Sequence, residues 1–163
     1  NPYAIASGLA ENIGLNAAVK PTGTAKRIQL AGAGDTMIGT FAGVRYTDTN
    51  GTPVFSKNWV SGTATLNSAD AVALVYDDPY ILFQAQASGA FSTAEIGLNA
   101  DLTAGAASSG ISTAAVDSTT FTTVTAQVRV VDYVRDDQNE VTTYSKLLVL
   151  INEHCLKAPT VGV

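Results

Sequence analysis

Apolar and polar residues alternate along short stretches of the chain, and clusters of Gly, Pro, Asn and Asp separate one stretch from the next. Residues 26–30 show this pattern, with Ile28 and Leu30 on one face. Because successive strand residues point to opposite faces, a period of two predicts strands. Short strands at this spacing are typical of an antiparallel barrel or sandwich. We therefore predict an all-β fold, with a single β-barrel or sandwich domain over residues 25–163.

The first 24 residues lack this regular pattern. Gly8, Gly14 and Pro21 interrupt them, and their apolar residues follow neither a strand nor a helix period. We predict an extended N-terminal arm over residues 1–24 that contributes at most one strand and that adds to the sheet edge of a neighbouring molecule. A disordered leader is the alternative, because chain ends are mobile unless contacts hold them.

Glycine and proline refine the strands expected next. Asn50-Gly51 favours a type I′ turn, in which both central residues have positive φ. Pro53, just after this turn, is typical of an edge strand because it has no N–H to donate. Gly39 and Gly43 lie inside the strand predicted over residues 37–46, and there they predict bulges or a sharply coiled strand.

Two hairpins are expected in the rest of the chain. Residues 71–76 are apolar at every position, which predicts a strand buried on both faces. The turn that follows leads into residues 80–86, so we predict that these two segments pair as a tight antiparallel hairpin. A second hairpin is expected to pair residues 121–134 with residues 144–152 across a polar turn.

The segment between these hairpins carries a helix signal and a loop signal. Ser92 and Glu95 have the spacing of a capping box, which predicts one short helical turn. Residues 103–120 consist mostly of Ala, Ser, Thr and Gly, and we predict a long loop there with Ile111 and Val116 as anchors.

Composition narrows the classes of function. Hydrophobic residues make up 46 % of the 163, enough for a core, but charged residues make up only 14 %, against about 25 % in typical domains. The net charge of −5 argues against a nucleic-acid partner, since such binding relies on Lys and Arg. A single cysteine, Cys155, excludes an internal disulfide framework. No apolar run approaches the roughly 20 residues that cross a bilayer, so no membrane partner is expected.

Charge is also unevenly distributed. Residues 58–128 hold six acidic residues and no Lys or Arg, whereas the two flanks together hold nine basic and eight acidic residues. Chance in a charge-poor chain is one interpretation. The other is a molecule with one acidic and one near-neutral side, which suits orientation on a larger assembly.

The sequence gives little support for a catalytic or cofactor-binding motif. His154 and Cys155 are neighbours, and adjacent strand residues point to opposite faces, so they do not form a nucleophilic pair. One His and one Cys do not complete a zinc site within one chain. Residues 31–35 resemble a glycine-rich nucleotide loop, but Met37 occupies the third glycine position, so we predict a turn. The sequence therefore predicts no catalytic residue, cofactor or metal site, and we expect no enzyme.

Two other groups of residues have both a structural and a functional interpretation. The pairs Asp77-Asp78 and Asp136-Asp137 are typical of turns, with a calcium site as the alternative, and Asp48 begins a loop too short for an EF-hand. Four aromatic side chains fit either the core or a sugar-binding platform: Trp59, Tyr80, Phe83 and Tyr144.

Six blocks, in order and spread over nearly the whole chain, carry a resemblance to known proteins: Asn1-Pro2-Tyr3, 41–46, 53–57, 75–87, 96–102 and 148–154. They resemble structural proteins of tailed bacteriophages, which are encoded beside the major capsid protein and resemble capsid decoration or cement proteins. The chain departs from that family at Ala4, where Gly is frequent, and in continuing past His154 to Val163.

The resemblance implies a non-enzymatic structural protein on the outer surface of the virion capsid. Its implied partners are the major capsid protein and further copies of itself, as a homotrimer or homodimer. The main alternative is a carbohydrate- or host-surface-binding β module that uses Trp59 and exposed Tyr side chains. A tail-associated structural protein is a third interpretation, and it differs from the first only in location.

Overall fold

The computed structural model describes residues 1–105 and 107–162, and its named strands pair antiparallel throughout. The predicted all-β fold class is confirmed. The strands are β1 (Pro2–Ile5), β2 (Ala18–Pro21), β3 (Ile28–Leu30), β4 (Gly39–Thr47), β5 (Pro53–Ser56), β6 (Ala71–Tyr76), β7 (Leu82–Gln86), β8 (Asn99–Ala100), β9 (Ala107–Ser108), β10 (Ile111–Ser112), β11 (Val128–Tyr133) and β12 (Lys146–Ile151). Two short 3-10 turns are η1 (Leu66–Ser68) and η2 (Thr93–Glu95).

The chain divides into two compact units, where the sequence predicts one domain over residues 25–163. The first unit is formed by Asn1–Ala31, Ile38–Asp77 and Gly105–Thr113. The second unit is formed by Gly32–Met37, Asp78–Ala104 and Ala114–Val163. The first unit holds a six-stranded sheet and the two-stranded β9–β10 sheet, and the second unit holds a four-stranded sheet.

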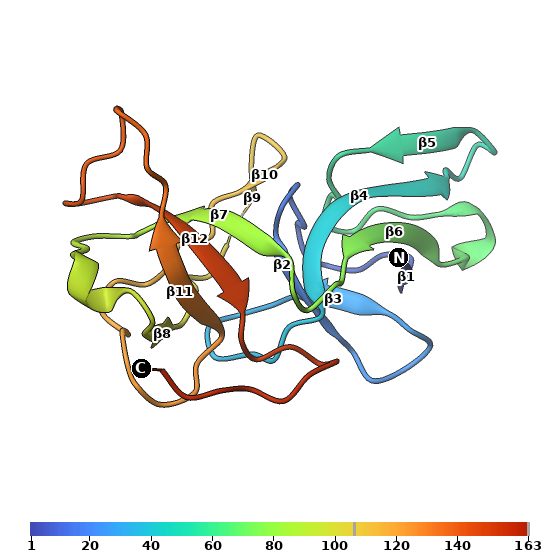
Figure 1. The fold of residues 1–163 in the computed structure, drawn as a ribbon. Coiled ribbons are helices and arrows are strands. Elements are labelled where there is room, and N and C mark those ends of the chain that lie inside the picture. Colours follow the sequence, from blue (N-terminus) through green and yellow to red (C-terminus); the bar gives the residue numbers. More distant parts are fainter. Residues whose placement is uncertain (106, 163) are drawn as a thin grey trace. The chain divides into compact units, whose positions relative to one another are not determined.

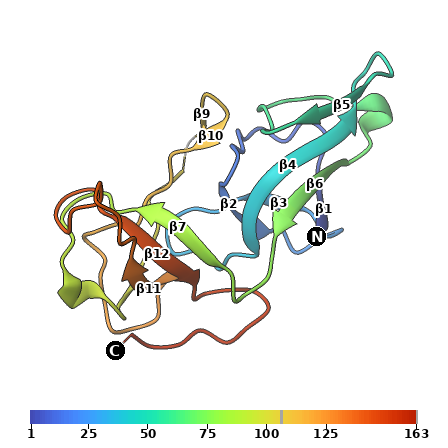
Figure 2. The same ribbon diagram turned by 45° about the horizontal axis from the view of Figure 1, so that its top comes forward.

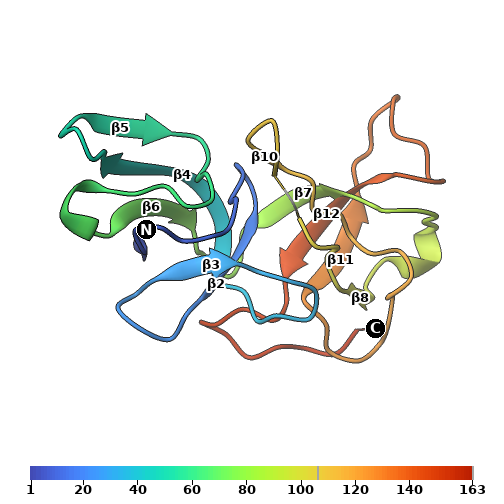
Figure 3. The same cartoon turned by 180° about the vertical axis from the view of Figure 1, so that it is seen from behind.

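The sheet of the first unit has the order β1-β6-β4-β2-β3, and β5 pairs with the C-terminal part of β4. Figure 1 shows β4 as a long curved strand between β5 and β6. The two end strands of the order, β1 and β3, approach each other, and Figure 3 shows β3 close to the N-terminus. The contact is made at Ala4 and Arg27, where the Ala4 N–H donates to the Lys26 carbonyl at 3.0 Å. The sheet therefore curls around a hydrocarbon core.

This core fills the concave side of the sheet with large apolar side chains. Trp59 is only 1 % exposed. Its ring meets Tyr46 edge-to-face at 5.7 Å, a favoured aromatic geometry, and its Nε1 donates to the Leu9 carbonyl at 3.2 Å. The buried cluster consists of Ile5, Ile13, Ala17, Val19, Ile28, Ile38, Phe41, Val44, Trp59, Ala71, Ala73 and Val75.

The arm predicted over residues 1–24 is part of the first unit and not a separate extension. β1 pairs with β6, with Pro2 opposite Leu74, and β2 lies between β4 and β3. Ile5 and Ile13 are fully buried. The sequence does not predict β1 and β2, because two four-residue strands separated by turns are too short to show a period of two. Their apolar side chains nevertheless complete the core.

The β4–β5 hairpin differs from the predicted type I′ turn. Gly51 has φ 83°, but Asn50 is not among the residues with positive φ. The Asp48 carboxylate accepts the N–H groups of Asn50 and Thr52 at 2.9 and 2.8 Å, and the Gly51 N–H donates to the Asp48 carbonyl. These bonds favour a type I turn closed by a single left-handed glycine.

Two other predictions for this hairpin are confirmed. β5 pairs only with β4, as expected for an edge strand that begins at Pro53. The register of β4 against β6 shifts between Phe41 and Gly43, which is the bulge expected near Gly43.

The predicted hairpin between residues 71–76 and 80–86 is wrong. β6 pairs with β1 and β4, whereas β7 pairs with β12 in the second unit. The Asp78 carboxylate accepts the Tyr80 N–H at 2.9 Å, a local turn that redirects the chain. The prediction that β6 is buried on both faces is also wrong, because Leu74 and Tyr76 are 48 % and 55 % exposed.

The sheet of the second unit has the order β7-β12-β11-β8, and Figure 2 shows β12 lying between β7 and β11. The β11–β12 pairing confirms the last predicted hairpin, although residues 121–127 precede the strand. η2 confirms the capping box, since the Ser92 N–H donates to Glu95 Oε2 at 2.6 Å and the Ala94 N–H to Ser92 Oγ at 3.3 Å.

The loop predicted over residues 103–120 contains the short β9–β10 hairpin, and Ala106 within it lies outside the described residues. Val116 is fully buried and anchors the segment as expected. Ile111 is instead about half exposed, although its backbone pairs with Leu15.

Buried polar side chains hold the loops of the second unit. The Gln127 side chain is fully buried, accepts the Leu102 N–H, and donates to the carbonyls of Gly32 and Asp35 at 2.8 and 2.9 Å. Asn152 donates to the Ala126 carbonyl at 3.0 Å. Each bond satisfies a loop backbone group that has no strand partner.

Candidate functional site

The first unit carries an open groove of about 460 Å³ on the outer face of its sheet. The floor comes from β4 and β6, one wall from β5, and the other wall from the segment that contains η1. Its lining residues are Arg45, Tyr46, Thr47, Pro53, Val54, Phe55, Thr65, Leu66, Asn67, Ala69, Asp70 and Val72.

Strand register brings three side chains of the groove into one row. Phe55 is opposite Arg45, and Arg45 is opposite Val72. Their chain neighbours Val44 and Ala73 are buried in the core, so alternation places this row on the outer face. Phe55 is 80 % exposed, the highest value among the exposed large hydrophobic residues described.

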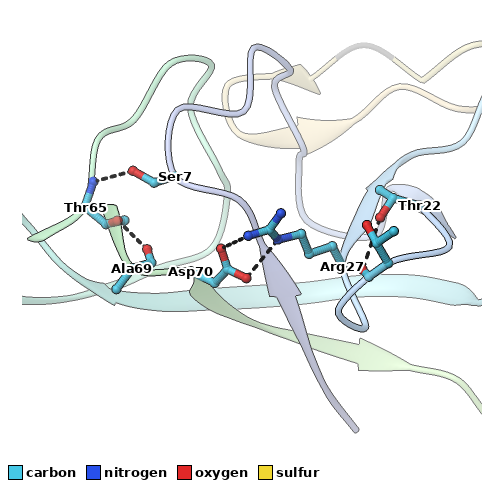
Figure 4. Close-up of polar contacts among 7 residues, drawn as sticks. Ser7, Thr22, Arg27, Thr65, Ala69 and Asp70 are labelled. Carbon is cyan, nitrogen blue, oxygen red and sulfur yellow. Dashed lines mark hydrogen bonds and ion pairs between the residues drawn. The ribbon is translucent and has the colours of Figure 1, made fainter. Parts of the chain in front are cut away.

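The wall opposite β5 is held in place by polar contacts (Figure 4). The Thr65 N–H donates to Ser7 Oγ at 3.1 Å, and the Thr65 hydroxyl donates to the Ala69 carbonyl. Asn67 and Ser68 have left-handed φ values of 53° and 56°, which turn the chain tightly at η1. This wall of the groove is therefore already formed in the protein without a bound partner.

The two guanidinium groups near the groove differ in their partners. Arg27 forms a bidentate pair with Asp70, with both N–O distances 2.8 Å, and the hydrogen bond and charge of that carboxylate raise the pKa of Arg27 (Figure 4). The Arg45 side chain makes no hydrogen bond or ion pair with any of residues 1–105 or 107–162. The groove thus combines apolar walls with a cation that has no carboxylate of its own.

The apolar character continues beyond the groove along the outer face of β6. Leu74 and Tyr76 follow Val72 on the same face, and both are about half exposed. Pro2 of β1 lies opposite Leu74 and is also exposed. Contiguous apolar surface of this kind is typical of an interface with another macromolecule.

The structure does not assemble His154 and Cys155 into a nucleophilic pair. His154 is buried, and its Nδ1 accepts the Leu156 N–H at 3.0 Å. The Cys155 N–H donates to the Met37 carbonyl at 2.8 Å, and burial raises the pKa of the Cys155 thiol. A raised pKa keeps the thiol protonated at neutral pH and lowers its reactivity.

Among the paired carboxylates, Asp77 fixes the N-terminal residues and Asp136 closes a turn. Asp77 accepts the Asn1 amide at 2.8 and 2.9 Å and the Tyr3 hydroxyl at 2.8 Å. Burial alone would raise the pKa of Asp77, but these hydrogen bonds outweigh it and lower the pKa. Asp136 accepts the Gln138 N–H at 3.3 Å in a turn. Within the described part of the chain, no group of three or more His, Cys, Asp or Glu residues is placed to hold a metal ion.

The sugar platform built on Trp59 is overturned, because that side chain is buried in the first unit. The other three aromatic residues proposed for it lie in the second unit. Tyr80 and Tyr144 are 74 % and 60 % exposed and Phe83 is half-buried. Lys157 Nζ lies 5.5 Å from the centroid of the Tyr80 ring.

The glycine-rich segment over residues 31–35 is the predicted turn. The Asp35 N–H donates to the Gly32 carbonyl at 3.3 Å, and the Gly32 N–H donates to the Asp35 carboxylate at 2.7 Å. The groove, in contrast, is not predicted from the sequence, although Arg45 and Phe55 fall within the 41–46 and 53–57 blocks that carry the resemblance. Pro53 was the nearest signal, since it marked β5 as an edge strand, but nothing local to Arg45 or Leu66 indicated that they share a site.

Comparison of the chain with protein-family models, with curated proteins and with solved structures finds no match in any of the three. Among the residues described, no helix has the length and apolar character needed to span a membrane.

Proposed function

We propose that this chain is a non-enzymatic structural protein of a tailed-phage virion that decorates and stabilises the outside of the capsid by bridging major capsid protein subunits. It acts as an oligomer, a homotrimer or homodimer, on the outer surface of the head. Its role is to reinforce contacts between capsid subunits against the internal pressure of the packaged DNA.

The observation that carries this proposal is the uncovered apolar face of the first unit. Phe55, Leu74 and Tyr76 project from that face into solvent. Arg45 is the charged residue in the row that it forms with Phe55 and Val72. A protein that functions alone in water gains nothing from leaving such side chains exposed. When a capsid subunit covers this face, burial of these apolar side chains stabilises the contact.

Sequence features support the same function. The six blocks that resemble phage structural proteins include 53–57, which contains β5, and 75–87, which begins at the end of β6. The chain has few long charged side chains, whose ordering at an interface costs about 0.5–1.5 kcal/mol each. Many copies on one lattice also gain affinity through multivalency, so that each contact can be weak.

Cryo-electron microscopy of virions of the phage that encodes this chain tests the proposal. We expect density that fits the two units at regular positions on the outer shell, in contact with more than one capsid subunit. Density confined to the tail would overturn the capsid role and favour the tail-associated alternative. Absence from the virion, together with binding to host glycans on an array, would favour the host-surface alternative.

A further inference from the structure

We propose that the groove between β5 and η1 is the capsid-binding site of this chain, and that it receives a surface segment of the major capsid protein that presents an apolar side chain next to a carboxylate. This inference rests on the function proposed above and names the contact surface and the chemistry of its partner. It assigns Phe55 and Leu66 to the apolar contact and Arg45 to the carboxylate.

The apolar half of the argument rests on burial. The Phe55 side chain is 80 % exposed, and Leu66 on the opposite wall is 38 % exposed. Between them the groove is about 460 Å³, which is enough for at least one side chain of an incoming segment. An apolar side chain placed there would be covered by Phe55, Leu66 and Val72, and all four would leave water together.

Charge complementarity supplies the other half. Asp70 is already engaged by Arg27 through two hydrogen bonds of 2.8 Å, so it does not neutralise Arg45. Arg45 makes no polar contact with any described residue and lies in the row between Phe55 and Val72. Guanidinium groups bind carboxylates in a bidentate geometry, and an apolar surround strengthens that interaction. The partner segment is therefore acidic at this point.

The groove is also ready to bind without rearrangement. The wall that contains η1 is fixed by the bonds from Thr65 to Ser7 and Ala69, and by the Arg27–Asp70 pair at its end (Figure 4). A preformed site loses little conformational freedom when its partner binds.

Binding to capsid heads assembled without this chain tests the site directly. The wild-type chain is compared with Phe55→Ala and Arg45→Glu, and sedimentation of the heads measures the bound fraction. We expect each variant to weaken binding by about tenfold or more, since both positions are at the centre of the contact. Arg45→Gln should also reduce the dependence of binding on salt, because one ion pair is lost.

Matched variants control for general effects. Lys57→Glu makes the same charge change at an exposed residue of the same unit, outside the groove lining. Tyr80→Ala removes an aromatic ring of similar exposure from the second unit. Both should bind heads like the wild type. Fluorescence of Trp59, the single tryptophan, verifies that each variant keeps the core of the first unit.

The outcomes separate the two proposals. If the wild-type chain does not bind heads, the capsid function is overturned, and the partner assigned to the groove falls with it. If the wild type binds but Phe55→Ala and Arg45→Glu bind equally well, only the groove assignment is overturned. If these variants keep head binding but lose self-association in analytical ultracentrifugation, the occupant is a second copy of the chain, which also overturns this inference.

Discussion

In the first unit the buried side chains are almost all hydrocarbon, whereas the second unit buries several polar ones. Thr65 is the buried polar residue among those described in the first unit, and the second has five: Asn99, Gln127, Ser145, Asn152 and His154. The difference follows from strand content. The first unit has a six-stranded sheet, whereas the second has a smaller four-stranded sheet and long loops, whose backbone groups need side-chain partners.

The units also differ in charge. The first unit has five basic and four acidic residues, a net of +1, and the second has four basic and ten acidic residues, a net of −6. This difference is not the one seen along the sequence, because the acidic segment over residues 58–128 is divided between the units, with Asp70 and Asp77 in the first. The near-neutral unit has the apolar groove, and the acidic unit contributes most of the net negative charge.

The comparison predicts that a cavity in the first core has the largest effect on stability. Phe41→Ala removes a fully buried ring from the centre of that core. We expect the free energy of unfolding to fall by about 3–5 kcal/mol. Denaturant titration followed by Trp59 fluorescence measures this change, because the indole lies in the same cluster. A loss below about 1 kcal/mol would contradict the view that hydrocarbon packing dominates this unit.

A smaller effect is expected from a polar deletion in the second unit. Gln127→Leu keeps a side chain of similar size but leaves the Leu102 N–H and the carbonyls of Gly32 and Asp35 without this partner. We expect a loss of about 1–3 kcal/mol, because water can reach the exposed 32–35 turn and replace part of the bonding.

Hydrogen exchange measured by mass spectrometry locates the effect of this variant. Exchange should increase at residues 32–37 and near Leu102, while Trp59 fluorescence in the first unit stays unchanged. A variant as stable as the wild type would show that apolar packing, and not polar satisfaction, holds the loops of the second unit.

The smallest predicted effect concerns one carboxylate of the first unit. The folded chain lowers the pKa of Asp77 below its ordinary value of 3.8, so the charged form stabilises the fold. This stabilisation is complete above that value and is lost as the pH falls through the lower folded-state pKa. We expect Asp77→Asn to cost about 1 kcal/mol at pH 7, through the hydrogen bonds from Asn1 and Tyr3.

Denaturant titrations of wild type and Asp77→Asn at pH 7, 5 and 3 measure this difference. The gap between the two proteins should be constant from pH 7 to 5 and narrow by pH 3. A gap that is independent of pH would show that Asp77 acts through its shape and not through its charge.

Features set by neighbouring residues could be predicted from the sequence. The Ser92–Glu95 capping box, the bulge near Gly43 and the edge strand at Pro53 depend on a few adjacent side chains and on backbone geometry. The choice of strand partner could not be predicted. A turn signal follows β6 and suits a hairpin with β7, yet β6 pairs with β4 and β1. The β1 residue Pro2 lies opposite Leu74 although the two are far apart in the sequence.

The groove was missed for the same reason. Arg45, Phe55 and Val72 become neighbours only through the register of three strands, and Leu66 reaches them through a loop with left-handed residues. The continuous apolar run of β6 predicts burial on both faces. In the folded chain half of that run forms the core and the other half remains on the surface.

The order in which the chain contributes to its two units has a consequence for engineering it. The chain passes from one unit to the other after Ala31, Met37, Asp77, Ala104 and Thr113. Neither unit is a continuous stretch, so no truncation at a single position yields either one intact. A fusion partner or an affinity tag that must preserve both units and the groove belongs at an exposed turn away from it, such as the one at Asp137 and Gln138.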